Sequence, residues 1–251
     1  MLTAENHVHD YEMGQNKPQA FWCVDDEGNR ARWVLKLMGS SVAELAADYA
    51  GSYLAHRLEL RCPQFDVAGV TREALQTAPD HVQAWAHVGP AFASRELIHS
   101  QSGLTDDDIA AKCEPEMLGA MFALDAWLDV LDRKNANIWN ALLETDDSRI
   151  YVIDYGKGLT PCLQKLLERP TDMSLVQAPK YPGSIRLLAS LDAARAACAT
   201  IEGLGRVELR ELANSIPADW MSQDSRGCIV EFLTLRQEHV RAVCEQMREA
   251  S

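Results

Sequence analysis

The chain has 251 residues, 47% hydrophobic and 24% charged, a composition typical of a globular protein with one large domain or two lobes. Its 37 acidic residues outnumber 24 lysines and arginines, and the resulting formal charge of −13 argues against direct nucleic-acid binding. No apolar run approaches the roughly 20 residues that cross a bilayer, and the polar first residues, MLTAENHVHDYE, predict no secretory signal.

Strand-like runs dominate the chain from residue 11 to about residue 96. Residues 20–26 and 30–37 predict a β-hairpin, because Gly28 and Asn29 supply a turn between β-branched and aromatic runs.

A helix is predicted next, over residues 41–60, where apolar residues recur at spacings of three and four. Ser41 is its expected N-cap, with Glu44 three residues on, and Pro63 lies beyond its end. Residues 65–70 and 82–88 predict two further strands.

Helical periodicity dominates after Gly103. An apolar stripe over residues 114–131 predicts a long helix, and residues 137–143 and 149–154 predict two strands joined by an acidic turn. From Pro161 onwards only helical periodicity is present, interrupted by prolines. The chain therefore divides into a β-rich N-terminal part with one helix and a mainly helical C-terminal part.

The seven cysteines are widely spaced and include no CxxC pair. Such a set is typical of reduced thiols and indicates a cytoplasmic protein without a zinc site. They are Cys23, Cys62, Cys113, Cys162, Cys198, Cys228 and Cys244.

Lys36 stands in the apolar run WVLKL at the end of the second predicted strand. An ammonium embedded among apolar neighbours needs a partner anion. An ordinary exposed lysine is the alternative interpretation of this residue by itself.

The segment DRKNAN lies between the predicted long helix and the strand after it, and Asn137 follows Asp132 by five residues. This is the spacing of a phosphoryl-transfer loop, in which the Asp orients a hydroxyl nucleophile and accepts its proton while the Asn helps to hold Mg²⁺. An ordinary polar loop is the alternative.

Asp154 ends an apolar strand in YVIDYGKGL and is followed two residues later by Gly156. A carboxylate at a strand end suits a Mg²⁺ that bridges phosphates, and a strand-terminating turn is the alternative. The predicted hairpin would bring Asp132 and Asp154 to one edge. The ordered combination of Lys36, a helix acid, this loop and Asp154 predicts a kinase-like phosphotransfer site.

The sequence resembles the HipA-like kinase family, in particular its compact, stand-alone kinase-domain proteins. The resemblance runs over nearly the whole chain. Its specific part is FALDAWLDVLDRKNANIW (122–139) and IDYGKGL (153–159), which are similar to the catalytic and metal-binding motifs of the family. Weaker similarity lies in MGQNKPQAFWCVDDEGNRARWVLKL (13–37), LAHRLELRCP (54–63), IPADW (216–220) and FLTLRQEHV (232–240).

The resemblance implies an α+β, bilobal fold related to protein kinases and phosphoinositide kinases. The expected lobes are residues 1–96, a nucleotide-binding sheet plus one helix, and residues 97–251, a helical lobe with the catalytic and metal-binding loops.

The resemblance also implies ATP and Mg²⁺ as cofactors. Lys36 would contact the α- and β-phosphates, Asp132 would be the catalytic Asp, and Asn137 and Asp154 would be the Mg²⁺ ligands. The loop over the phosphates, which lacks a full G-x-G-x-x-G, would consist of Gly14, Gln15, Asn16 and Lys17.

The sequence departs from the family pattern at the helix acid that pairs with the lysine, which is usually Glu. Alignment places Asp48 there, and Glu44 lies one turn earlier on the same helix face. We expect Asp48 to pair with Lys36, with Glu44 as the alternative. A second departure is that Asn135 precedes Asn137 in the loop, and the five-residue spacing favours Asn137.

Residues 88–96 are expected to cross between the lobes, where the backbone of such folds contacts the adenine edge. Trp85 and Phe92 either flank the base or pack in the core. Asp125, on the predicted long helix, is expected to be structural, and the H-x-H pair His7 and His9 to be incidental.

We therefore expect an ATP- and Mg²⁺-dependent phosphotransferase with a protein Ser/Thr substrate. The alternatives are an inert pseudokinase that serves as a nucleotide- or partner-binding module, and a kinase for a small molecule or lipid. The family resemblance also implies an antitoxin-like protein as a partner. No membrane association is expected.

Overall fold

The computed structural model of the chain describes residues 1–11, 18–130, 132–135, 138–159 and 176–248. In its N-terminal part, five strands form a closed barrel in the order β1-β2-β3-β5-β4. The strands are β1 (Leu2–Asp10), β2 (Gln19–Val24), β3 (Arg30–Met38), β4 (Phe65–Val70) and β5 (His87–Arg95).

The predicted hairpin is confirmed as β2 and β3, which pair antiparallel from Gln19 opposite Leu35 to Val24 opposite Arg30. Gly28 in its turn has a φ of 85°, a conformation that glycine adopts without a Cβ clash. Alternate β3 side chains are buried inside the barrel, including Trp33 and Leu35. Lys36 therefore points to the opposite side of the strand.

The first strand, β1, was not predicted, because LTAENHVHD has too few apolar residues to show a clear alternation. It is held by its neighbours, pairing antiparallel with β2 and parallel with β4, which closes the barrel. Register shifts interrupt its pairing with β2 between Ala4 and Asn6 and between His7 and His9.

Helix α1 (Val42–Arg57) forms where a helix was predicted, and Ser41 is its N-cap residue without a side-chain cap bond. The helix ends well before Pro63, at a turn in which Glu59 has a φ of 56°. Its buried residues include several alanines, so the helix packs closely between the barrel and the helical part.

The prediction of a strand over residues 82–88 is wrong. The short helices α2 (Arg72–Gln76) and α3 (Asp80–Gln83) occupy this region, and the strand β5 starts at His87. Pro79 is the N-cap of α3 and accepts the backbone hydrogen bond of Val82. Strand β5 pairs with both β3 and β4, so the segment expected to cross between lobes is a central barrel strand as far as Arg95.

The C-terminal part is mainly helical, as predicted. The short helix α4 (Asp106–Lys112) precedes α5 (Pro115–Leu128), and α7 (Gly183–Leu188), α8 (Leu191–Gly203), α9 (Arg206–Ser215) and α10 (Gln223–Glu245) follow, with a final 3₁₀ turn over Gln246–Arg248. Short strands lie between α5 and α7. They are β7 (Lys134–Asn135), β8 (Ile138–Trp139), β9 (Ala141–Glu144) and β10 (Arg149–Val152), and β9 also pairs with β6 (Ser100–Gln101).

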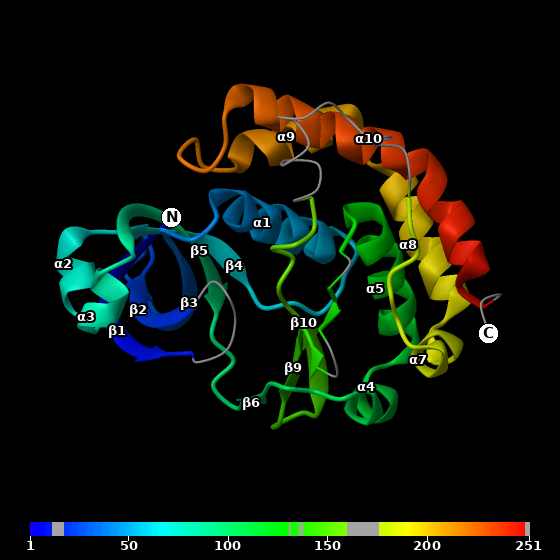
Figure 1. Cartoon of the computed structure of the whole chain (residues 1–251), viewed down its shortest axis with the longest axis horizontal. Coiled ribbons are helices and arrows are strands. Elements are labelled where there is room, and N and C mark those ends of the chain that lie inside the picture. The colour runs from blue at the N-terminus through cyan, green and yellow to red at the C-terminus, as the bar shows by residue number, and fades with distance from the viewer. Residues whose placement is uncertain (12–17, 131, 136–137, 160–175, 249–251) are drawn as a thin grey trace.

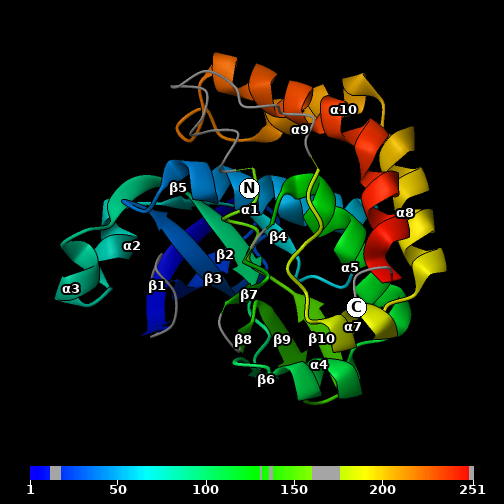
Figure 2. The ribbon, with the colours of Figure 1, turned by 45° about the vertical axis from the view of Figure 1, so that its right-hand side comes forward.

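The arrangement of these parts is visible in Figures 1 and 2. The barrel lies at one end, α1 and the β9–β10 hairpin lie centrally, and α8, α9 and α10 curve around α5 and over α1. One hydrophobic core fills the barrel, and a larger one joins α1 to the C-terminal helices. The prediction of an α+β fold with a β-rich N-terminal part and a helical C-terminal part is confirmed.

The buried Trp127 links α5 to α10, since its Nε1 donates a hydrogen bond of 2.9 Å to the carbonyl oxygen of Leu233. Arg236 of α10 in turn donates a hydrogen bond of 2.7 Å from its Nε to the carbonyl oxygen of Trp127.

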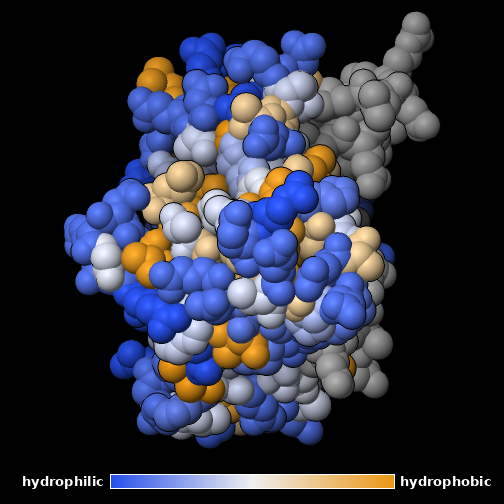
Figure 3. All heavy atoms as spheres, turned by 90° about the vertical axis from the view of Figure 1, so that its left-hand side faces the viewer, coloured by the Kyte–Doolittle hydropathy of each residue, from blue (hydrophilic) through white to orange (hydrophobic). Residues whose placement is uncertain are grey.

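The barrel end of the molecule presents a largely hydrophilic face with scattered apolar side chains (Figure 3). Within the described part of the chain, no helix has the length and apolar character needed to span a membrane.

Candidate active site

Lys36 lies where the barrel, α1 and the turn after β10 meet. Its Nζ donates hydrogen bonds of 2.7 Å to Asp48 Oδ2 and 2.8 Å to Asp154 Oδ1. Burial alone would lower the pKa of Lys36, but the two carboxylates outweigh burial and raise it well above its usual value. The lysine is therefore fully charged, and three elements distant in sequence converge on it.

Asp48 is 1% exposed and receives a second hydrogen bond, from the backbone N–H of Tyr155 to its Oδ1 at 2.8 Å. Burial raises the pKa of Asp48, Lys36 lowers it and Asp154 raises it, and the balance is a pKa of about 6. Asp48 thus connects α1 both to the lysine and to the residue that follows Asp154.

Glu44, the alternative partner of Lys36, forms an ion pair with Lys157. Glu44 lies one turn before Asp48 on α1, and from there its side chain reaches the turn after Asp154. The structure therefore pairs Asp48 with Lys36 and Glu44 with Lys157, and the two acids hold both ends of the segment from Tyr155 to Lys157.

Asp154 has a φ of 61°, in the left-handed region, which turns the chain sharply after β10. Burial acts to raise its pKa, but Lys36 and Arg133 outweigh burial and hold the pKa below its ordinary value. The Asp154 side chain is 41% exposed, so its carboxylate is open to solvent. A Cβ at Gly156 would lie 3.1 Å from Asp48 Oδ2, so a larger residue would crowd this contact.

Asp132 is half-buried, and its Oδ1 is buried with no hydrogen-bond partner among the residues that the structure describes. Burial raises the pKa of Asp132, and the charge of Asp154 raises it further. The backbone of this loop is held by a hydrogen bond of 2.9 Å from Asn140 Nδ2 to the carbonyl oxygen of Asp132. The backbone of Asp132 is therefore held in place, and its carboxylate has an acceptor oxygen that no described residue uses.

A comparison with protein families shows the family of this chain. Residues 8–249 match the family model described as HipA-like kinase, which covers nearly the whole chain. The chain belongs to the HipA-like kinase family. No curated protein matches it.

Solved structures show that the HipA-like chain has the fold of kinases. The crystal structure of the Helicobacter pylori proinflammatory kinase CtkA superposes with a TM-score of 0.64 at 12% identity, covering 99% of this chain and 98% of that one. The Golgi casein kinase, in a crystal structure with Mn and ADP bound, has a TM-score of 0.55 at 10% identity, covering 100% of this chain and 75% of that one. The expected kinase-like fold is confirmed.

Arg133, which follows Asp132, is a buried residue beside the site that the sequence patterns did not identify. Its guanidinium is buried and forms a two-point contact with Asp125, with Nε to Oδ2 at 2.9 Å and Nη2 to Oδ1 at 2.8 Å. Its Nη1 also donates to the carbonyl oxygens of Ile153 and, at 3.2 Å, Asn140. Arg133 therefore ties α5 and the Asp132 loop to the residue before Asp154.

The Asp125–Arg133 pair has a third member, since the Tyr181 hydroxyl donates 2.6 Å to Asp125 Oδ2. The sequence interpretation of Asp125 as structural agrees with these contacts. Nothing in the local pattern identified Arg133, because a loop arginine is usually exposed and only the packing of Tyr155 and α5 around it shows otherwise.

Several predicted site residues lie outside the described part of this HipA-like kinase. These are Gly14, Gln15, Asn16 and Lys17 of the expected phosphate loop, and Asn137 of the expected metal site. Their roles stay predictions.

The two aromatic residues considered for the adenine site lie in or against the hydrophobic cores. Phe92 of β5 is 6% exposed in the larger core and lies directly opposite Lys36 in the strand register. Trp85 packs against the core of the barrel.

The residues of the site fit a hard divalent cation beside a phosphate. Asp154 offers an ionised, partly exposed carboxylate, and the buried Oδ1 of Asp132 has no partner among the described residues. Oxygen ligands of this kind suit Mg²⁺, which usually takes only one or two carboxylates from the protein. Within the described ranges, no three His, Cys, Asp or Glu side chains form a metal-binding group.

Proposed function

We propose that this HipA-like kinase is an ATP- and Mg²⁺-dependent phosphotransferase, with Asp132 and Lys36 as its catalytic residues. The observation that carries the proposal is the double contact of Lys36 with Asp48 and Asp154. This double contact holds the charged Lys36 beside the Asp154 carboxylate. The charge of Asp154 in turn raises the pKa of a second carboxylate, Asp132. Positive charge, a metal ligand and a proton acceptor are the three groups that phosphoryl transfer requires.

Each residue has a separate task in this proposal. The Lys36 ammonium binds the α- and β-phosphates, and Asp48 keeps it oriented. Asp154 and Asn137 would hold the metal, and Gly14 to Lys17 would cover the phosphates. Asp132 orients the acceptor hydroxyl and takes its proton at the carboxylate. Mg²⁺, when bound with ATP, neutralises the charge that spreads over the transferred phosphoryl group.

The substrate that we propose is a serine or threonine side chain of a protein, and membership of the HipA-like family supports it. The same membership supports an antitoxin-like partner and a cytoplasmic location. The structure with Mn and ADP bound is of a kinase with the same fold, and this supports a nucleotide and a divalent metal for the present chain.

An inert module was the alternative because Asp48 is shorter than the usual Glu. The 2.7 Å contact between Lys36 and Asp48 supports an active kinase, since the shorter side chain reaches the ammonium. The incomplete glycine loop, the second reason for this alternative, lies in residues that the structure does not describe.

The proposal is tested by thermal unfolding of the wild type and Asp154→Ala, with and without Mg·ATP. A ligand at 100 times its Kd stabilises the native state by about 2.7 kcal/mol, which raises the melting temperature measurably. We expect a Mg²⁺-dependent rise in the wild type and its loss in Asp154→Ala. Asp107→Ala is the matched control, because it removes one exposed carboxylate on α4. No rise at millimolar Mg·ATP in the wild type would reject the proposed function.

A further inference from the structure

Many arginines of this acidic chain form ion pairs with acidic side chains, but several in the described part of the chain do not. On the helices around α9, Arg195 pairs with Glu245, Arg241 with Glu202 and Arg57 with Glu208. Arg206 and Arg210 of α9 are exposed and form no ion pair with any described residue. In a chain of net charge −13, two guanidinium groups one helical turn apart that have no acidic partner in the described ranges form a local positive site.

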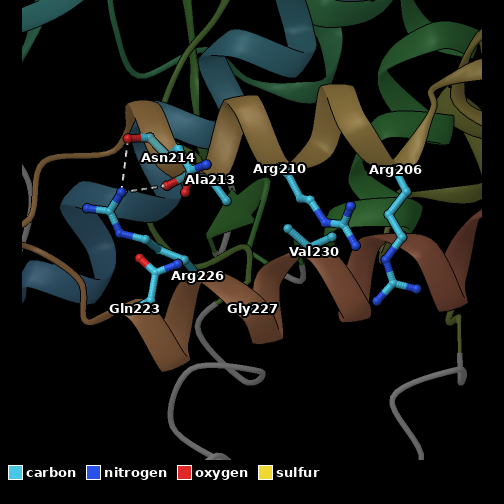
Figure 4. A pocket seen from close by; sticks show the side chains of 8 residues that line it. All are labelled: Arg206, Arg210, Ala213, Asn214, Gln223, Arg226, Gly227 and Val230. Atoms are coloured by element: carbon cyan, nitrogen blue, oxygen red, sulfur yellow. Dashed lines mark hydrogen bonds between the residues drawn. The ribbon is translucent and has the colours of Figure 1, made fainter.

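These two arginines line a pocket between α9 and α10. The pocket has a volume of about 280 Å³ and is lined by Arg206, Arg210, Ala213, Asn214, Gln223, Arg226, Gly227 and Val230. Figure 4 shows the Arg206 and Arg210 side chains extending from α9 towards α10, with Asn214 and Gln223 at the other end of the pocket. None of these residues belongs to the Lys36 site.

A third arginine, Arg226, stabilises the pocket. It is 9% exposed and donates to the carbonyl oxygens of Asn214 at 2.9 Å and Ala213 at 3.2 Å, and also to that of Ile216 at 2.6 Å. These bonds use carbonyls that the end of α9 leaves without helical partners. Arg226 forms no ion pair among the described residues, and its charge is offset by these carbonyl oxygens at the end of α9.

The pocket is kept open by Gly227 of α10. A Cβ at this position would have no atom within 4 Å, so close packing does not require glycine there. Glycine inside a helix costs about 1 kcal/mol relative to alanine. The absence of a side chain leaves the space beneath the two arginines free for a ligand.

We propose that the α9–α10 pocket binds the phosphate group of a phosphorylated serine or threonine in a protein segment. A phosphomonoester carries a charge of about −1.5 to −2 at pH 7 and three acceptor oxygens, enough to bind two guanidinium forks at once. A carboxylate has a single charge and two oxygens. The Asn214 and Gln223 side chains supply neutral donors and acceptors for the peptide backbone beside the phosphate, which favours a peptide over a free ion.

The test is fluorescence anisotropy of a labelled short peptide with one phosphoserine, its unphosphorylated form, and inorganic phosphate as competitor, with the full chain. We expect binding of the phosphopeptide alone, weakened about tenfold or more by Arg206→Gln or Arg210→Gln, because a hydrogen bond to a charged group is worth that much. Arg72→Gln is the control, since it removes one exposed arginine elsewhere and should leave the affinity unchanged.

Gly227→Leu fills the pocket without touching the arginines. This variant should have a melting temperature at or above that of the wild type, because leucine favours a helix more than glycine does, and it should lose phosphopeptide binding. An equal loss in Arg72→Gln, or equal affinity for the unphosphorylated peptide, would reject the site. Inorganic phosphate that binds as tightly as the phosphopeptide would show a free-ion site and overturn the peptide proposal. Because the site is separate from Lys36, Asp154→Ala should bind the phosphopeptide normally even if phosphotransfer fails.

Discussion

The Lys36 ammonium donates a 2.7 Å hydrogen bond to Asp48 Oδ2, which joins strand β3 of the barrel to helix α1. The second oxygen of the same carboxylate accepts from the backbone N–H of Tyr155, one residue after Asp154. A single buried side chain thus sets the position of the lysine relative to the expected metal-binding turn. This relationship leads to the first prediction.

Asp48→Asn should weaken Mg·ATP binding about tenfold or more, because Lys36 loses a charge-assisted hydrogen bond and its orientation. The Kd is measured by isothermal titration calorimetry. Glu44→Gln removes an acid one turn away that pairs with Lys157, and it should change the Kd much less. Equal losses in the two variants would contradict a specific role for Asp48.

Asp132→Asn should lower the rate of phosphoryl transfer by a factor of about 10²–10⁴, the usual contribution of a general base. The amide cannot take the proton of the acceptor hydroxyl, but Lys36 and Asp154 are untouched. ADP formation measures the rate, and the Mg·ATP-dependent rise in melting temperature should stay as in the wild type. Turnover unchanged in this variant would remove Asp132 from the mechanism.

The pH dependence of stability should reflect Asp48. Its pKa is about 6 in the folded chain and near 3.9 when unfolded, so the folded state binds more protons between these values. The contribution of this group to the free energy of unfolding is therefore present in full below about pH 4 and is lost as the pH rises through 6.

Urea unfolding of the wild type and Asp48→Asn at several pH values between about 4 and 7 checks this sign. The variant lacks the titration, so its free energy of unfolding should improve relative to the wild type as the pH rises. A difference between the two proteins that stays constant with pH would contradict the raised pKa of Asp48.

Arg133→Met should destabilise the fold by about 3–5 kcal/mol, because it leaves the buried Asp125 carboxylate without its partner. The double variant Asp125→Leu/Arg133→Met should be less destabilised than the sum of the single changes. Arg195→Met breaks an exposed pair with Glu245 and should cost no more than about 1 kcal/mol. Denaturant unfolding provides all of these values.

Gly51→Ala should destabilise the chain by about 1–3 kcal/mol, as overpacking of a core does. A Cβ at Gly51 of α1 would lie 2.3 Å from the Cβ of Tyr155, so the turn after Asp154 must shift. The Mg·ATP-dependent stabilisation should fall as well. Gly203→Ala at the end of α8 meets no atom within 4 Å and should leave both measurements close to wild type.

Local sequence patterns predicted the elements that consist of strong periodic runs. The β2–β3 hairpin, α1, α5 and β4 formed where they were expected. Residues 82–88 alternate like a strand, but Pro79 and the backbone bond from Val82 start a helical turn there instead. Strand β1 has little apolar content and depends on β2 and β4, neighbours that a local pattern does not show.

The sequence by itself determined the family, the α+β class and the expected positions of the lysine and the acids, because these follow from residue type and spacing. Only the tertiary structure decided that Asp48 contacts Lys36 while Glu44 contacts Lys157, and that Arg133 is buried against Asp125. Lys36 and Asp154 are 118 residues apart, and their contact depends on how α1 packs between the barrel and the turn after β10. Such a contact is set by the rotation and depth of a packed helix, which residue spacing does not specify.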